Sequence, residues 1–193
     1  MAVNPSNVIQ GPATIYWGAF GTTEPADTNA ALIAAPGAGW TDMGATTGGV
    51  TVSIEHTYGV IKADQLVDNI GARLTGRTIT VAMGLLEATL QNLLVAMNQA
   101  ANISTLAGVT TFDPVTATSA TQPTYTALLV DGWAPTLGTG AAARRRFIVR
   151  KLLSDVKASA KYDLTTQVTW DSTFTAYYVS PSIAPFHIQD QTS

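Results

Sequence analysis

Residues 49–57, GVTVSIEHT, decide the fold, because apolar and polar side chains alternate strictly along them. A period of two is typical of a strand with one buried and one solvent-facing side. Glu55 and His56 therefore point to opposite faces, and Glu55 cannot orient the imidazole. We interpret His56 as a strand residue at the margin of a sheet, not as a catalytic base.

Other segments share this β character, being rich in β-branched and aromatic residues. They lie at residues 12–20, 73–83, 125–135 and 163–179. In the last of them Trp170 and Phe174 fall on the apolar face. We predict one domain over residues 1–193, a mostly antiparallel β-sandwich or barrel, with flexible arms at 1–11 and 180–193.

A single segment, about residues 85–99, has helical periodicity. Its apolar side chains form one stripe, made of Leu86, Leu90, Leu93, Leu94 and Met97. Glu87 falls in the expected first turn, where the helix dipole favours an anion. We expect the stripe to pack on the sheet. Residues 21–39 and 101–123 are expected to be long loops, which are functional or mobile in most compact domains.

Charged residues make up only 12% of the chain, against roughly 25% in an average globular protein. A protein surface with so few charged residues is best explained if other subunits cover much of it. The net charge of −3 argues against binding nucleic acid through phosphate neutralisation.

Catalytic and metal-binding patterns are missing from the sequence. There is no cysteine, and the two histidines are far apart, so no metal-ligand spacing is present. No nucleophile elbow accompanies them. We expect neither enzyme activity nor a cofactor. The N-terminus lacks a signal-peptide pattern and no stretch is apolar enough to span a membrane, so we expect cytoplasmic synthesis and no membrane contact.

Arg144, Arg145 and Arg146 are the densest run of charge. In an isolated domain the simplest interpretation is a solvated strand end. In an assembly these guanidinium groups could pair with carboxylates of a neighbouring subunit. Nucleic-acid readout is the weakest of the three interpretations, and we predict subunit contacts ahead of DNA contacts.

Two segments resemble the major tail tube proteins of long-tailed, siphovirus-like bacteriophages: WTDMGATTGGVTVSIEHTYGVIKADQ at 40–65 and GRTITVAMGLLEATLQNLLVAM at 76–97. The resemblance covers the middle third of the chain best. The matching positions are Trp40, Gly44, Gly48, Gly49, Val50, Ala63, Asp64, Gln65, Glu87, Thr89 and Leu90.

This resemblance implies a structural virion protein with the tail-tube type of β-sandwich. Such subunits form hexameric rings that stack into a tube, through which double-stranded DNA passes during genome ejection without specific binding. The implied partners are further copies of the chain and the tape measure, tail tip and terminator proteins. The implied location is the virion tail, after synthesis in the host cytoplasm.

Two alternatives stay open on the sequence. One is another virion structural β protein, such as a decoration or tail-completion subunit. The other is a carbohydrate-binding β-sandwich module that uses tryptophans as stacking platforms. The candidates for such platforms are Trp17, Trp40, Trp133 and Trp170, of which Trp170 is better explained as core.

The resemblance also locates a contact element between the strands expected at 49–57 and 68–83. Residues 58–67 should form an extended excursion that touches the adjacent ring, and Glu55 should line the channel or the ring interface. The candidate contact residues are Val60, Ile61, Lys62, Asp64, Gln65 and Asp68, together with Arg144, Arg145 and Arg146.

Overall fold

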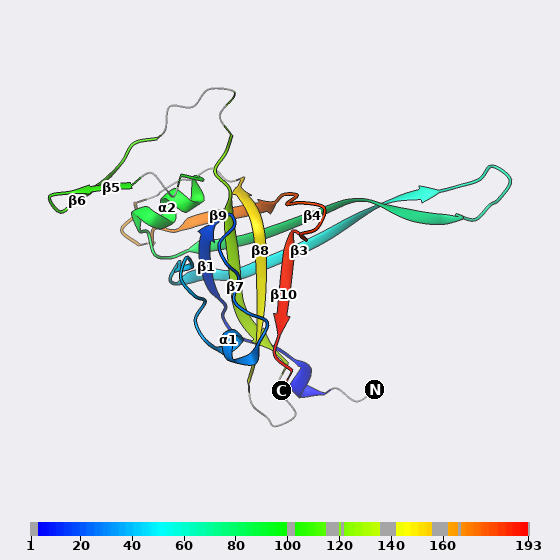
Figure 1. Ribbon diagram of the computed structural model, residues 1–193, viewed down its shortest axis with the longest axis horizontal. Helices are drawn as coiled ribbons and strands as arrows, with labels where there is room; N and C mark the ends of the chain where they lie inside the picture. Colours follow the sequence, from blue (N-terminus) through cyan, green and yellow to red (C-terminus); the bar gives the residue numbers. More distant parts are fainter. Residues whose placement is uncertain are drawn as a thin grey trace.

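The computed structural model describes residues 4–99, 103–114, 120, 122–135, 142–155, 162–165 and 167–192. It is a mainly antiparallel β protein, as predicted (Figure 1). The strands are β1 Thr14–Ala19, β2 Thr41–Asp42, β3 Thr46–Ile61, β4 Gly71–Leu85, β5 Ile103–Leu106, β6 Val109–Phe112, β7 Thr126–Ala134, β8 Ala143–Ser154, β9 Trp170–Ala176 and β10 Phe186–Asp190. The helices are η1 Pro5–Asn7, α1 Asn29–Ile33 and α2 Leu90–Ala96.

Eight strands form one continuous sheet in the order β2-β1-β7-β8-β9-β4-β3, with β10 paired to β8. The sheet bends on itself, so that β3 and β4 run across β7 and β8 (Figure 1). The main core lies between these parts, as in a sandwich with crossed strands. Its buried members are Ile15, Met43, Ile79, Val81, Met83, Leu85, Val95, Leu128, Val130, Val149, Leu152, Trp170 and Phe174.

The central strand β7 is buried on both faces. Leu128 and Val130 point into the main core, whereas Ala127 and Leu129 join a second cluster with Trp40. This second cluster lies under the segment that carries α1. Double burial explains why residues 127–130 form an unbroken apolar run, since neither face needs polar residues.

A glycine pair sets the register of β3. Thr47 pairs with Gly84 and Val50 pairs with Met83, so Gly48 and Gly49 bulge out without partners. Both have positive φ, 71° and 81°, which glycine adopts without a steric penalty. The strict alternation of residues 50–57 begins directly after this bulge, and its apolar members pack on the main core as predicted.

The predicted helix is shorter than its apolar stripe suggested. The hydroxyl of Thr89 caps α2 by accepting from the Asn92 amide at 3.2 Å, which starts the helix at Leu90. Glu87 therefore lies outside the helix, and its expected place in the first turn was wrong. Its carboxylate instead accepts from the Ala45 amide at 3.0 Å, linking the two segments that carry the family resemblance.

The two expected terminal arms and the two long loops contain more structure than predicted. Residues 186–190 form β10 on β8, and Gly11 packs so closely on the Trp133 ring that a Cβ would lie 2.5 Å from it. The segment 21–39 contains α1, and 101–123 contains the β5–β6 hairpin. The partners of β10 and α1 lie far away along the chain, so the sequence did not reveal these two elements. The β5–β6 hairpin pairs with itself across Ala107 and Gly108, and its small and polar residues resembled those of a loop.

Packing of α2 on the sheet gives a first test. Leu94 is fully buried, with an exposed fraction of 0%. We expect Leu94→Ala to lower the free energy of unfolding by about 2–5 kcal/mol, since it leaves a cavity. Urea denaturation measures this loss. Leu106→Ala, at a side chain that is 80% exposed, is the control and should change stability by less than about 0.5 kcal/mol. Equal effects would contradict the packing described here.

Candidate assembly interface

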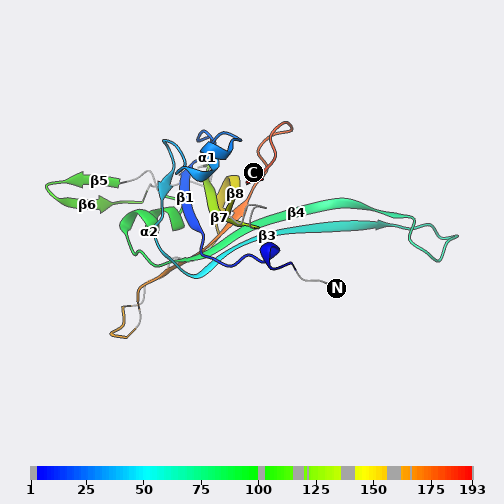
Figure 2. The same ribbon diagram turned by 90° about the horizontal axis from the view of Figure 1, so that it is seen from below.

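β3 and β4 continue past the body as a two-stranded arm, which we define as residues 55–78 (Figures 1 and 2). Pairing of β4 with β9 ends at Thr80, so beyond this point β3 and β4 pair only with each other. The tip loop, residues 62–70, is closed by the Ile70 amide donating to the Ile61 carbonyl at 2.9 Å. The arm is thus a regular hairpin standing away from the core.

This hairpin corrects the expected extended excursion at 58–67, which was thought to lie outside the paired strands. The strands stay paired as far as Ile61 and Gly71. A register shift after Thr57 leaves Thr75 as a bulge on β4, and the Thr75 hydroxyl donates to the Thr57 carbonyl at 3.1 Å. Gly59 does not break the strand. It makes room for Thr75, whose methyl would lie 3.0 Å from a Cβ there.

One face of the arm is apolar and exposed. It continues the core-facing side of β3 outward from Ile54, through Tyr58 and Val60, with Leu74 paired opposite Tyr58. Tyr58 is 59% and Val60 53% exposed. Four more exposed apolar side chains lie near the tip: Ile61, Leu66, Val67 and Ile70. Clustering of this kind on a projecting element marks an interaction surface.

The predicted contact residues of this region lie together at the arm's end. Val60 and Ile61 finish β3, and the tip loop carries the exposed polar candidates Lys62, Asp64, Gln65 and Asp68. His56 lies nearer the body, opposite Arg77 and stacked on Tyr58 at 6.2 Å between ring centroids. Glu55 is exposed on the other face.

The face of β3, β4 and β9 that carries Glu55 is made of short and mostly polar side chains. From Thr47 to Thr57 on β3 its side chains are nearly all Thr, Ser, Ala or Gly, and the charged members of this part, Glu55 and Asp171, are both carboxylates. The register places together Thr47, Thr51, Ser53, Glu55 and Thr57 of β3, Thr78, Thr80, Ala82 and Gly84 of β4, and Asp171, Thr173 and Thr175 of β9. This part of the face therefore carries only negative charge, whereas further out on the arm Arg73, paired opposite Gly59, lies on the same side.

Arg146 belongs to the interior, which removes it from the candidate contacts. It is fully buried and pairs with Asp131 at 2.8 Å. It also donates to the carbonyls of Ala31, Leu32 and Ala34 at 3.2, 3.0 and 3.0 Å. These carbonyls end α1, where a cation satisfies otherwise unpaired acceptors. The arginine thus fastens the 21–39 segment to the sheet.

The other two arginines also have partners within the chain. Arg145 pairs with Asp190 of β10, and Arg144 lies 4.6 Å above the Trp133 ring. Both remain half-buried, so they form no broad basic surface. The sequence could not show this, because the paired carboxylate of Asp190 and the ring of Trp133 come from other strands.

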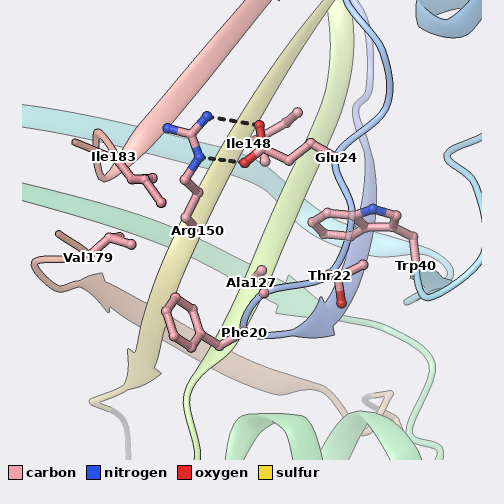
Figure 3. Close-up of a pocket in the computed structure, with 10 residues that line it drawn as sticks. Phe20, Thr22, Glu24, Trp40, Ala127, Ile148, Arg150, Val179 and Ile183 are labelled. Carbon is pink, nitrogen blue, oxygen red and sulfur yellow. Dashed lines mark hydrogen bonds and ion pairs between the residues drawn. The ribbon is translucent and has the colours of Figure 1, made fainter.

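An ion-pair cluster ties the C-terminal strand to the same segment. Arg150 makes a bidentate pair with Glu24 (Figure 3), and His187 Nδ1 lies 3.3 Å from the same carboxylate. The hydrogen bonds from Arg150 hold the pKa of Glu24 below its ordinary value of 4.5, against the opposing effect of partial burial.

The tryptophans do not form a carbohydrate platform. Trp40 and Trp170 are buried, Trp17 is half-buried against the core, and the guanidinium of Arg144 covers Trp133. Within the described residues no group of histidines and carboxylates could hold a metal ion. In the same part of the chain no helix is long and apolar enough to cross a membrane.

Together, the crossed antiparallel sheet and the projecting arm with its exposed apolar side chains define a structural β protein with a candidate interaction surface. A family model described as phage tail tube protein matches residues 1–179, so the chain belongs to the phage tail tube protein family. This family is structural, not a class of enzymes, and its members build the virion tail by self-assembly. Membership decides against the decoration and carbohydrate-binding alternatives. No curated protein matches the chain.

Burial of Arg146 gives a second test. Arg146→Ala removes the hydrogen-bonded partner of buried Asp131 and leaves only the guanidinium of Arg144 at 3.8 Å, so we expect the free energy of unfolding to fall by about 3–5 kcal/mol. Arg145→Ala breaks an exposed pair and should cost about 0–1 kcal/mol. Urea denaturation of the unassembled chain measures both. Similar small losses from the two variants would contradict the structural role of Arg146.

The Glu24 pair predicts a pH dependence. Its folded-state pKa is lowered, so its stabilising contribution is present above the unfolded-state pKa and is lost as pH falls through the folded-state value. Glu24→Gln should therefore melt below the unmodified chain at neutral pH, and the gap should close in acid. Melting curves from pH 7 to about pH 3 test this. An undiminished gap at the acid end would contradict it.

Proposed function

We propose that the chain forms hexameric rings, that the rings stack into the tail tube, and that the channel of the tube conducts the genome during ejection. The observation that carries this proposal is the arm with its exposed apolar side chains. Family membership supports the tail tube role, and the geometry of the arm supports the way in which copies would join. The tube ends would meet the tape measure, tail tip and terminator proteins.

Burial of the arm is large enough to drive association. Full burial of one Val, Leu or Ile side chain contributes roughly 1.5–3 kcal/mol. The cost of losing free motion on association is about 4–15 kcal/mol. One or two such side chains would not offset this cost. The arm exposes seven, Tyr58, Val60, Ile61, Leu66, Val67, Ile70 and Leu74, each by 43% or more, so a neighbour that covers them can.

The outer edge of β3 supports ring formation. In the described part of the chain, β3 pairs with β4 and has no strand on its other side. The strand is 16 residues long, and a long unpaired edge invites pairing with another copy. Pairing from subunit to subunit would satisfy these backbone groups and close the sheet into a ring.

The acidic face supports a channel lining. DNA adheres to proteins mainly by releasing counterions at cationic side chains. Between Thr47 and Thr57 the Glu55 face has carboxylates and small hydroxyl side chains, and a cation, Arg73, lies only further out on the arm. This part of the face would therefore repel phosphates and let the duplex slide. In this proposal Glu55 and Asp171 face the channel, and double-stranded DNA passes without specific binding.

Shortening the arm tests the proposal. Residues 58–75 are deleted and Asn-Gly is inserted between Thr57 and Gly76, a directly paired position that a two-residue turn can close. The core is untouched, so the shortened chain should fold with a normal circular dichroism spectrum. We expect negative-stain microscopy to show no tubes. Normal tubes from this chain would overturn the proposed role of the arm.

Point variants provide a matched control with the backbone intact. Val60→Ser changes the apolar face of the arm and should reduce tube yield strongly. Thr57→Ser changes the opposite face of the same strand and should leave tube yield unchanged. Equal yields from the two variants would show that the apolar face is not the contact.

A further inference from the structure

We propose that the arm tip of one copy docks into a hollow on the body of a second copy, with Leu66 and Val67 entering the hollow and Asp64 or Asp68 pairing with Lys151 at its rim. This inference rests on the proposed tube assembly and identifies the acceptor site, which the arm itself does not reveal.

The acceptor is a mainly apolar hollow of about 330 Å³ on the outer side of β7 and β8, and the paired side chains of Glu24 and Arg150 also line it. Phe20, Val179 and Ile183 stand on one side of it and Trp40 on the other (Figure 3). Phe20 is 45% and Ile183 47% exposed. Large apolar side chains at this level of exposure gain stability when a partner covers them.

A cation is held beside the hollow. Lys151 Nζ lies 5.5 Å from the centroid of Phe20 and 4.3 Å from that of Tyr125. These aromatic rings fix the position of the ammonium group without neutralising it. Among the described residues no carboxylate forms an ion pair with Lys151, whereas neighbouring Arg150 is already paired with Glu24. Lys151 is therefore free to accept a carboxylate from outside.

The arm tip has the complementary chemistry. Val67 is 104% and Leu66 60% exposed, and the pair is flanked by Asp64 and Asp68. A turn in which the Leu66 amide donates to the Ala63 carbonyl at 3.1 Å shapes this part of the loop. Two adjacent aliphatic side chains between carboxylates match an apolar hollow with an ammonium group at its rim.

The occupant must come from another copy. The tip lies at the far end of the long axis, well beyond β7 and β8 (Figures 1 and 2). A contact between two different surfaces of identical chains is heterologous, and repetition of it generates a ring or a stack. This is the arrangement that the proposed function requires.

Cysteine cross-linking tests the site directly, because the natural chain has no cysteine. Chains carrying Val67→Cys are mixed with chains carrying Ile183→Cys, allowed to assemble under reducing conditions, and then treated with a short bismaleimide. We expect covalent dimers on a denaturing gel from the mixture and none from Val67→Cys mixed with Leu106→Cys. Leu106 lies on the β5–β6 hairpin and is more accessible than Ile183, with 80% against 47% of the residue exposed.

A charge reversal provides an independent readout. Lys151→Glu should abolish most tube formation, and adding Asp64→Lys with Asp68→Lys should restore it in part. Tubes that form normally without the Val67–Ile183 cross-link would overturn this acceptor site while leaving the proposed function in place. If the unmodified chain never polymerises, the proposed function fails, and this inference fails with it.

Discussion

Backbone pairing between β3 and β4 continues where the hydrophobic core ends, and the rest of the structure depends on this constraint. Inside the body, the register set by the Gly48–Gly49 bulge turns Val52 and Ile54 toward the core. Outside it, the same register turns Tyr58 and Val60 toward solvent. The alternation that builds the core therefore also builds an apolar surface that the described residues leave exposed.

In the body from which this hairpin projects, two arginines form ion pairs with carboxylates of the same chain. Arg146 is buried against Asp131 and the carbonyl end of α1, and Arg150 joins Glu24 beneath the C-terminal strand. These pairs neutralise two arginines of the body. An apolar arm, a carboxylate-bearing face and a lysine held by aromatic rings remain accessible, and they suit contacts between copies better than chemistry on a small molecule.

Local patterns in the sequence predicted the β class and the alternation of residues 50–57, because both depend on neighbours along the chain. The sequence could not reveal contacts between residues that lie far apart along the chain. Arg144–Arg146 looked like surface charge because Asp131 and Asp190 come from other strands. Residues 58–61 looked like a loop because Gly59 usually weakens a strand, whereas here it accommodates the Thr75 bulge.

The central claim is that a second copy covers the arm. Hydrogen exchange of backbone amides, compared between unassembled chains and tubes, measures this most directly. Amides on the outer edge of β3 between residues 55 and 61 should exchange much more slowly in the tube, while those of β7, already paired on both sides, should change little. Equal exchange of the arm in both states would contradict the account.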